Sequence, residues 1–367
     1  MINGWIDRGF NKRKKESPFH PGGRAVVVNR KPDFFIVGAP KCGTTALDHF
    51  LAAHPDVFMA RKEMHFFGAD LRFAQHFYRR DLPAYLAEFA AADSNRRAGE
   101  ASVWYLFSEN AATEMKEFNP DARIIIMLRN PVEMIHSLYY QFFFDGNEQL
   151  AGFEEALAAE DDRRAGRRLG RQHYFAQGLV YRETARYTRQ VERYFKAFGR
   201  DRVHVIIYDD FAADADAIFR RTLEFLGVAS HAIPGGSRVI NGNKHVKNPI
   251  LRAVLNDPSL RRAVLAARPL LPQAIFSALG RTEARLRKLN TVPATRAALS
   301  PELRLRLNQE FAPEVERLSA LLGRDLTSWS REMRGPKEIA APAPAPASAP
   351  KTARPIEECA DRVIGVA

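Results

Sequence analysis

The sequence predicts an α/β, P-loop-like three-layer fold in which helices flank a central parallel sheet. Short apolar runs that are typical of buried strands, at 34–38, 122–128 and 203–208, alternate with segments of helical periodicity. The first run is followed directly by a glycine-bounded loop and the start of a helix. In such sheets ligands bind beyond the carboxyl ends of the strands, so we expect the functional loops to gather at that edge.

Length and composition define the domain organisation that we expect. The chain has 367 residues, of which 46% are hydrophobic and 27% charged, as in a globular protein. We expect a flexible basic arm over residues 1–30, a single folded domain over 31–335 and a disordered tail over 336–367. The tail is rich in alternating alanine and proline, a composition that cannot bury a core.

Charge and the distribution of apolar residues limit the classes of partner. The sequence has no apolar run of about 18 residues, and its first residues lack the apolar centre of a signal peptide. Two widely separated cysteines, Cys42 and Cys359, indicate a reducing, cytoplasmic location. The net charge of +12 favours an anionic partner. We expect a phosphorylated cofactor and no nucleic acid, because the arginines are not interleaved with aromatic residues in one block. The basic arm is interpreted as solvated, with peripheral contact to an anionic surface as the alternative.

The remaining elements follow from periodicity and from stop signals. The run at 122–128 is the clearest strand, because a continuous β-branched segment is typical of central parallel strands. Pro131 suits the first turn of the helix that follows it. In chain order we expect a helix at 46–54, strands at 57–59 and from 99, helices at 73–78, 83–91 and from 131 to 144, an exposed charged segment at 160–171, helices at 179–198 and 213–226, a polar loop at 241–248, and helices at 249–268 and 300–322.

Residues 38–45, which we call the anion cradle, are the first candidate site. Backbone N–H groups at a helix N-terminus and the helix dipole both favour an anion there. The spacing from Gly38 to Gly43 is that of a P-loop, but a nucleotide triphosphatase would have Gly-Lys-Ser/Thr. Here Gly43 is followed by Thr44 and Thr45, and Lys41 stands two places before the glycine. We expect Lys41 to stabilise negative charge on a leaving group.

The ends of two other strands separate two classes of enzyme. The strand at 122–128 ends in Arg129, with Ser137 two helical turns further on, and an arginine with a hydroxyl can bind a phosphate monoester. A magnesium-dependent kinase or nucleotidase would instead need an acidic residue at a strand end. Asp209 and Asp210 are the candidates for that role. We interpret them as structural, for example as the N-cap of the next helix.

The segment 62–67 contains a candidate general base. On an extended chain, Glu63 and His65 share one face, while Phe66 points the other way. We expect desolvation by Phe66 and Phe67 to raise the basicity of Glu63. A surface salt bridge between Glu63 and His65 is the alternative interpretation.

These motifs together resemble the PAPS-dependent sulfotransferases, which transfer a sulfuryl group from 3′-phosphoadenosine-5′-phosphosulfate (PAPS) to an alcohol. Residues 35–45 are similar to the family's 5′-phosphosulfate loop, and 129–131 with Ser137 to its 3′-phosphate motif. Residues 62–67 resemble the K-E-x-H-F-F signature of the heparan sulfate O- and N-sulfotransferase branch, which has soluble bacterial members. The resemblance covers residues 33–330 and includes 178–181 and 225–227 as further family elements.

The resemblance implies a role for each matched residue. Glu63 would be the general base for in-line displacement, Lys41 would stabilise the departing phosphate, and His65 would orient the base or the acceptor. The product would be adenosine 3′,5′-bisphosphate, and no metal is expected. The residues that would bind the donor are Lys41, Cys42, Gly43, Thr44, Thr45, Arg129, Ser137 and, from the loop that closes over the cofactor, Lys244.

The acceptor is the least specified part of the prediction. We expect a hydroxyl, or an amine, of a carbohydrate or another hydroxylated metabolite, presented as a small molecule, a glycan or a lipid-linked molecule. Arginine-rich segments at 163–171 and 281–287 fit an anionic acceptor, although a solvated charge run is the simpler interpretation. Two other functions stay open: a P-loop kinase or nucleotidase that uses Mg-ATP, and a basic protein whose loop holds only a structural anion.

Overall fold

The computed structural model describes residues 30–74, 80–170, 173–233, 244–246 and 297–331, with scattered positions between 255 and 293. The described residues belong to one compact unit that ends at Arg331. Residues 1–29 of the expected arm, the expected tail at 336–367 and most of the expected helices at 73–78 and 249–268 lie outside the described residues.

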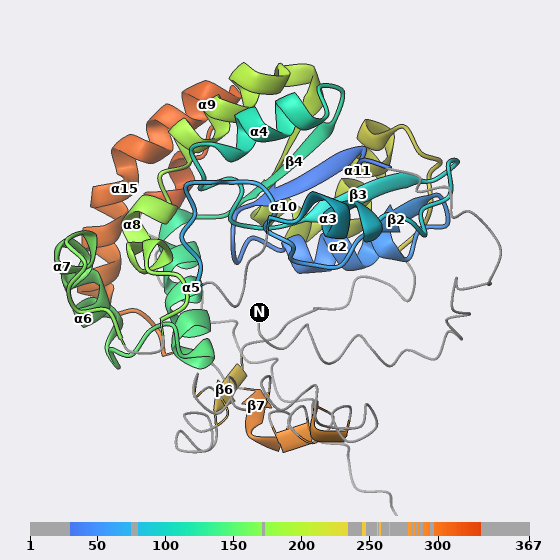
Figure 1. Ribbon diagram of the computed structural model, residues 1–367. Helices are drawn as coiled ribbons and strands as arrows, with labels where there is room; N and C mark the ends of the chain where they lie inside the picture. Colours follow the sequence, from blue (N-terminus) through green and yellow to red (C-terminus); the bar gives the residue numbers. More distant parts are fainter. Residues whose placement is uncertain are drawn as a thin grey trace, which may run out of the picture. The chain divides into compact units, whose positions relative to one another are not determined.

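A five-stranded parallel sheet forms the centre of the fold and confirms the predicted α/β class (Figure 1). Its strands are β1 (Phe34–Gly38), β2 (Val57–Met59), β3 (Arg97–Ala101), β4 (Arg123–Leu128) and β5 (Val203–Ile207). They are ordered β2-β3-β1-β4-β5, and each neighbouring pair is parallel. Every residue of β1 is buried, because helices cover both faces of the sheet. The carboxyl ends of β1 and β4 are adjacent and carry the two predicted phosphate motifs.

The helices and 3₁₀ turns connect these strands. They are α2 (Thr44–Ala52), α3 (Leu82–Ala87), α4 (Ala111–Phe118), α5 (Pro131–Asp145), α6 (Phe153–Ala158), α7 (Glu160–Arg164), η3 (Gln177–Leu179), α8 (Tyr181–Thr184), α9 (Tyr187–Phe198), η4 (Arg200–Arg202), α10 (Tyr208–Ala213), α11 (Ala215–Leu226), α15 (Pro301–Leu322) and η6 (Thr327–Trp329).

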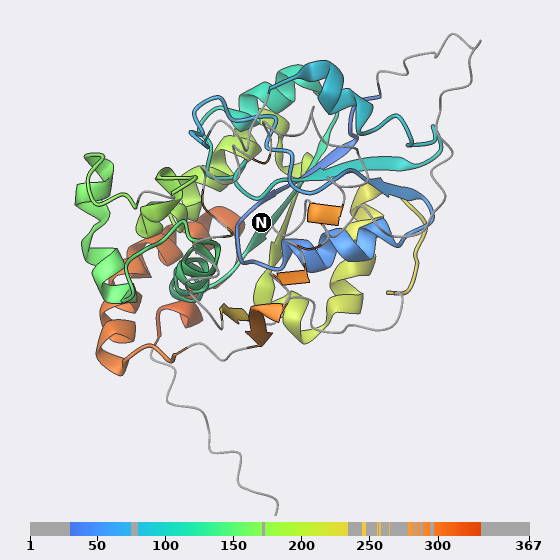
Figure 2. The ribbon, with the colours of Figure 1, turned by 60° about the horizontal axis from the view of Figure 1, so that its bottom comes forward.

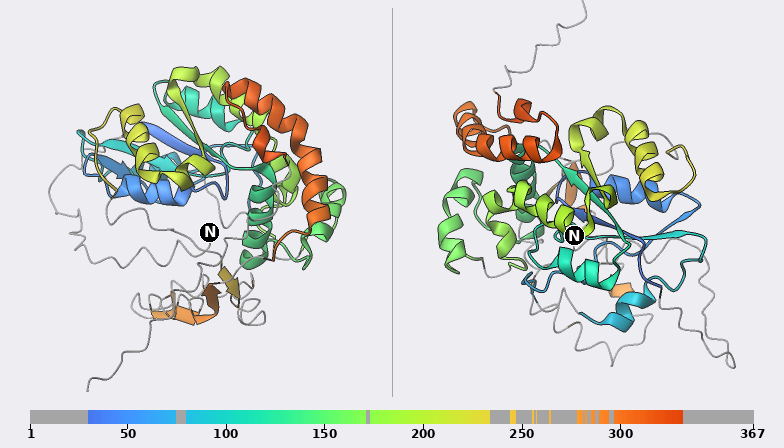
Figure 3. Two further views of the ribbon diagram at one scale, coloured as in Figure 1. Left: turned by 180° about the vertical axis from the view of Figure 1, so that it is seen from behind. Right: turned by 90° about the horizontal axis from the view of Figure 1, so that it is seen from above.

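Two helical layers enclose the sheet. On one face α2 lies beside α11, and the rings of Phe50 and Phe219 are 6.0 Å apart (Figure 2). On the other face α9 packs against β4 and β5 and contacts α4. Helix α15 lies along α9 and α5 and forms an outer layer on that side (Figure 3). A separate two-stranded antiparallel sheet pairs β6 (Lys244–Val246) with β7 (Thr291–Pro293), and β6 contacts α5.

The prediction of one continuous helix at 179–198 is wrong. The segment is divided into α8 and α9, because Arg186 has a non-helical backbone with φ −81° and ψ 73°. Glu314 of α15 accepts a hydrogen bond of 2.7 Å from the N–H of Thr188, so a distant side chain satisfies the start of α9. Another difference lies at Tyr208, which begins α10 although it was expected to end a strand.

None of the helices in the described part of the chain is long and apolar enough to cross a membrane.

Candidate active site

The anion cradle links β1 to α2 through an unusual backbone. The N–H of Ala39 donates to the carbonyl of Met127 at 2.7 Å and so ties the cradle to β4. Lys41 has φ 62° and Gly43, the N-cap of α2, has φ 93°. A non-glycine residue with positive φ is uncommon, and such strain is found preferentially at functional sites. The strained backbone is that of Lys41, the residue that the sequence analysis predicts to stabilise the leaving group.

Gly43 fits the start of α2 because its backbone and its neighbours both disfavour a side chain. A Cβ atom at this position would lie 3.3 Å from both Met127 Cε and Tyr208 Cδ2, and the positive φ disfavours any side chain. The first N–H groups of a helix have no intrahelical acceptor, and the first turn of α2 contains no acidic residue. This N-terminus is therefore suited to an anionic group.

Two side chains position the polar groups of the cradle, and the sequence analysis missed both. Lys41 Nζ donates to Gln141 Oε1 of α5 at 2.9 Å, and Gln141 Nε2 lies 3.0 Å from both carboxylate oxygens of Asp145. Lys62, which is only 8% exposed, donates to Thr44 Oγ1 at 3.1 Å. Lys62 was recognised only as the first residue of the motif at 62–67, with no role of its own. No motif or periodicity around Gln141 indicates a functional residue.

Cys42 differs from the rest of the cradle because its side chain is fully buried. Burial raises the pKa of its thiol to about 12, against the opposing effects of the Arg129 charge and the nearby Tyr187 hydroxyl. The side chain therefore faces the core, and only the backbone of Cys42 is available to a bound anion. The charges of Arg129 and Lys41 both act on this thiol, which places the two cations around one point.

The end of β4 places Arg129 and Ser137 next to the cradle. The Arg129 guanidinium lies over the Tyr208 ring, 4.6 Å from its centroid, and 3.7 Å from Glu133. Glu133 also accepts a 2.7 Å hydrogen bond from Arg304 of α15. Burial raises the pKa of Glu133, but the hydrogen bond and charge of Arg304, together with Arg129, bring it below its ordinary value. Ser137 Oγ is buried and has no hydrogen-bond partner among the described residues.

A buried hydroxyl without a partner is unfavourable, so Ser137 Oγ is available to a polar group at this place. Pro131 at the first turn and the Asn130 side chain, which accepts from the N–H of Val132 at 2.9 Å, fix the start of α5. The strand end and this cap together aim Arg129 and the first turns of α5 at the same edge of the sheet.

Glu63 and His65 form the predicted pair. His65 Nε2 lies 2.9 Å from Glu63 Oε2, and the two side chains are only 12% and 6% exposed. His65 has φ 48° and stacks on Phe73 with ring centroids 4.7 Å apart. The alternative of a surface salt bridge does not fit this degree of burial.

The expected effect on basicity is wrong in its net direction. Burial raises the pKa of Glu63, but the hydrogen bond and charge of His65 and the charge of Lys62 outweigh it, so the pKa lies below the ordinary 4.5. Phe66 and Phe67 do not enclose the carboxylate: Phe66 stacks on Tyr85, and Phe67 packs edge-on against Phe35. Glu63 is therefore ionised at neutral pH, as a proton acceptor must be.

The remaining predicted residues lie at the periphery. Lys244 lies in β6, next to α5, and its side chain is outside the described part of the structure. Asp209 accepts from Trp329 Nε1 at 2.7 Å, and Asp210 binds Arg324. Both carboxylates lie in the first turn of α10 and connect it to the segment after α15, so they are structural, although neither is an N-cap.

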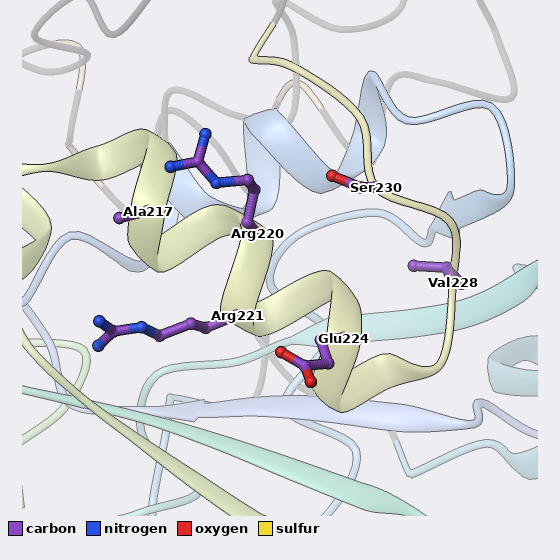
Figure 4. A pocket seen from close by; sticks show the side chains of 6 residues that line it. All are labelled: Ala217, Arg220, Arg221, Glu224, Val228 and Ser230. Atoms are coloured by element: carbon purple, nitrogen blue, oxygen red, sulfur yellow. The ribbon is translucent and has the colours of Figure 1, made fainter.

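A hollow between α11 and the loop that follows it contains none of the predicted site residues (Figure 4). It is lined by Ala217, Arg220, Arg221, Glu224, Val228 and Ser230. In the described ranges, no three His, Cys, Asp or Glu side chains form a group that could hold a metal ion.

Comparison with known proteins identifies the class of enzyme. The family model described as "Sulfotransferase domain" matches residues 31–246. The chain therefore belongs to the sulfotransferase family and is a transferase.

Individual relatives agree with this assignment. The crystal structure of a sulfotransferase from Alicyclobacillus acidocaldarius is 33% identical, with a TM-score of 0.59, and the match covers 82% of this chain and 100% of that chain. Mouse carbohydrate sulfotransferase 15 is 30% identical over 38% of this chain and 32% of its own length. Mouse bifunctional heparan sulfate N-deacetylase/N-sulfotransferase 1 is 27% identical over 62% of this chain and 25% of its own length. The chain thus spans a quarter to a third of these two curated relatives.

Proposed function

We propose that this enzyme transfers a sulfuryl group from PAPS to a hydroxyl or amine of a carbohydrate or a related hydroxylated metabolite. Sulfotransferases as a family use this donor. The names of the mouse relatives point to carbohydrate and heparan sulfate acceptors. The carbohydrate class is extended to this chain on that basis.

The residues present fit a donor with two phosphate-bearing ends. The N-terminus of α2 with Lys41 and Thr44 suits the 5′-phosphosulfate, because its first turn has no acidic residue and its first N–H groups have no intrahelical acceptor. Arg129 and the unpartnered hydroxyl of Ser137 suit the 3′-phosphate, which ATP lacks. We also propose that the backbone of Cys42, the Thr45 hydroxyl and Lys244 contribute to donor binding.

Each side chain then has a defined task. The bound donor supplies the sulfuryl group. Glu63, ionised at neutral pH, accepts the proton of the acceptor group. His65 holds the Glu63 carboxylate in place at 2.9 Å. Lys41, held by Gln141, neutralises charge on the phosphate oxygens.

The observation that carries the proposal is the buried Glu63–His65 pair on a segment joined to the cradle by Lys62. The 3.1 Å bond from Lys62 to Thr44 connects a proton acceptor to an anion-binding helix start. A protein that only binds a structural anion has no need of a buried base at that place.

A sulfate-transfer assay with labelled PAPS and candidate glycans tests the proposal. We expect Glu63→Gln to lower kcat by about 10²- to 10⁴-fold, because the amide cannot accept the proton. Lys41→Ala should lower it by about 10²- to 10³-fold. Arg167→Ala, at an exposed ion pair with Asp162, is the control and should retain wild-type kcat. Near wild-type turnover of Glu63→Gln at saturating donor would refute the assignment of the base.

A further inference from the structure

The segment that carries Glu63 and His65 is held by a buried polar network centred on Glu100 of β3. Four consecutive backbone N–H groups, those of residues 64–67, donate to only two side-chain hydroxyls. Met64 and His65 each donate to Ser102 Oγ at 3.0 Å. Phe66 and Phe67 donate to the Tyr105 hydroxyl at 2.6 Å and 3.4 Å.

Both hydroxyls donate a hydrogen bond to the same carboxylate oxygen. Ser102 donates to Glu100 Oε1 at 2.8 Å, and Tyr105 donates to Glu100 Oε1 at 2.7 Å. A hydroxyl group has one proton and two lone pairs. The hydroxyls of Ser102 and Tyr105 each use their lone pairs to accept from two backbone N–H groups. The proton of each hydroxyl must therefore point away from the segment, and Glu100 is the acceptor that receives it.

Glu100 is fully buried, as are Ser102 and Tyr105. Burial raises the pKa of Glu100 above its ordinary value, and the three hydroxyl donors oppose this only in part. The third donor is Tyr85, which reaches Glu100 Oε2 at 2.7 Å. The donor count is satisfied by a carboxylate, which has no proton of its own to place.

We propose that Glu100 is a positioning residue for the transfer reaction, which fixes the Glu63–His65 segment through Ser102 and Tyr105. The inference rests on the proposed function, because it assumes that Glu63 is the base. The network explains how His65 is kept at φ 48°, since the hydroxyl of Ser102 holds the N–H of His65 and of the residue before it. A displacement of about 1 Å in a reacting group lowers kcat by about 10²-fold.

Three variants separate positioning from general stability. Glu100→Met keeps the volume but removes the acceptor oxygen, and Ser102→Ala removes the hold on two N–H groups. Tyr85→Phe is the matched control, because Tyr85 also donates to Glu100 but binds no backbone N–H of residues 64–67. We expect kcat to fall by about 10- to 100-fold in Glu100→Met and Ser102→Ala, with an unchanged KM for PAPS. Tyr85→Phe should keep wild-type kcat.

The conservative variant Glu100→Gln should restore most of the activity. Its oxygen can accept from both Ser102 and Tyr105, while its NH₂ group turns to Tyr85, whose hydroxyl then accepts. We expect its kcat to stay within about threefold of the wild type. Urea unfolding of each variant gives the folded fraction by which kcat is corrected, and if Glu100→Met does not fold, Ser102→Ala decides.

The outcomes also distinguish this inference from the proposed function. Glu63→Gln is assayed in parallel. If it keeps wild-type kcat, the base assignment fails, and the positioning role fails with it. If Glu63→Gln is inactive while Ser102→Ala and Glu100→Met keep wild-type kcat, only the positioning role is overturned. An equal loss of kcat in Tyr85→Phe would also overturn it, because the loss would then come from a general weakening of the core around Glu100 and not from the bonds to residues 64–67.

Discussion

Positive backbone φ angles mark the proposed site at the level of single residues. Lys41 and His65 are two of only three non-glycine residues with positive φ in the described part of the chain. Such conformations cost free energy and persist where the surroundings fix them. Gln141 holds the Lys41 side chain and Ser102 holds the His65 backbone, so both strained residues are fixed by side chains from other elements.

Gly43→Ala tests the anion cradle. We expect the Kd for adenosine 3′,5′-bisphosphate to rise by about tenfold or more, because the positive φ and the contacts with Met127 and Tyr208 force the start of α2 to shift. Gly323→Ala is the matched control: Gly323 also has positive φ, at the end of α15, but a Cβ there meets nothing within 4 Å. Gly323→Ala should lose about 1–2 kcal/mol of stability from its positive φ alone, and Gly43→Ala at least as much, so urea unfolding gives the folded fraction by which each titration is corrected. Calorimetric titration that finds the same Kd for both would contradict the role of the cradle.

The acidic limb of the pH profile tests the Glu63–His65 pair. Because the pKa of Glu63 lies below 4.5, the base stays ionised and kcat should be constant from pH 7 down to about 5. In His65→Ala the hydrogen bond and charge of the imidazole are lost, while burial, Lys62 and the nearby Tyr174 remain. The pKa of Glu63 then rises, and the acidic limb should move to higher pH.

The measurement is kcat against pH at saturating donor, with His49→Ala, an exposed histidine of α2, as the control. The linked stability has the same sign: a depressed pKa stabilises the fold above the unfolded-state pKa, and this contribution is lost as the pH falls through the folded-state pKa. An unmoved limb in His65→Ala would show that His65 does not set the ionisation of Glu63.

At the level of the elements, the sequence was most informative where local signals decide the structure. The strands at 34–38 and 122–128, Pro131 at the start of α5 and the stop at Gly323 after α15 were all predicted, because apolar runs, prolines and glycines act locally. The Glu63–His65 pair was also predicted, but from alternation along an extended chain, whereas His65 has φ 48° in the structure.

The features that were missed depend on contacts between distant parts of the chain. Gln141 reaches Lys41 across 100 residues, and Glu314 caps α9 from 126 residues away. The predicted effect of Phe66 and Phe67 on Glu63 was wrong. Their rings pack against Tyr85 and Phe35 from other elements and not around the carboxylate. No periodicity in a single sequence encodes such partners.

A buried ion pair between Arg163 and Glu148 joins α7 to the segment after α5, and its contribution to stability can be tested. The two groups are 2.8 Å apart, each side chain is 1% exposed, and Tyr181 also donates to Glu148. Arg163→Met would leave the Glu148 charge buried without its partner, so we expect a loss of about 3–5 kcal/mol in the free energy of unfolding. Arg167→Ala breaks an exposed pair on the same segment and should cost less than about 1 kcal/mol. Urea unfolding that finds equal losses would contradict this account.

At the level of the whole molecule, parallel strand order brings the site together. The adjacent strands β1 and β4 deliver the cradle and Arg129 to one edge, and β3, on the other side of β1, leads to Ser102 and Tyr105, which hold the segment of the base. The net charge of +12 favours the approach of an anionic donor. The two proposed phosphate sites and the proposed base thus lie after three neighbouring strands.

The most direct test of the central claim is a calorimetric titration of the protein with adenosine 3′,5′-bisphosphate and, separately, with ATP and Mg²⁺. Arg129 with Ser137 should bind the 3′-phosphate, and Lys41 with the start of α2 should bind the 5′-phosphate. We therefore expect adenosine 3′,5′-bisphosphate to bind more tightly, without a divalent ion, and to lose affinity in Lys41→Ala and Arg129→Ala. Tighter binding of ATP that requires Mg²⁺ would contradict the account and favour a kinase or nucleotidase.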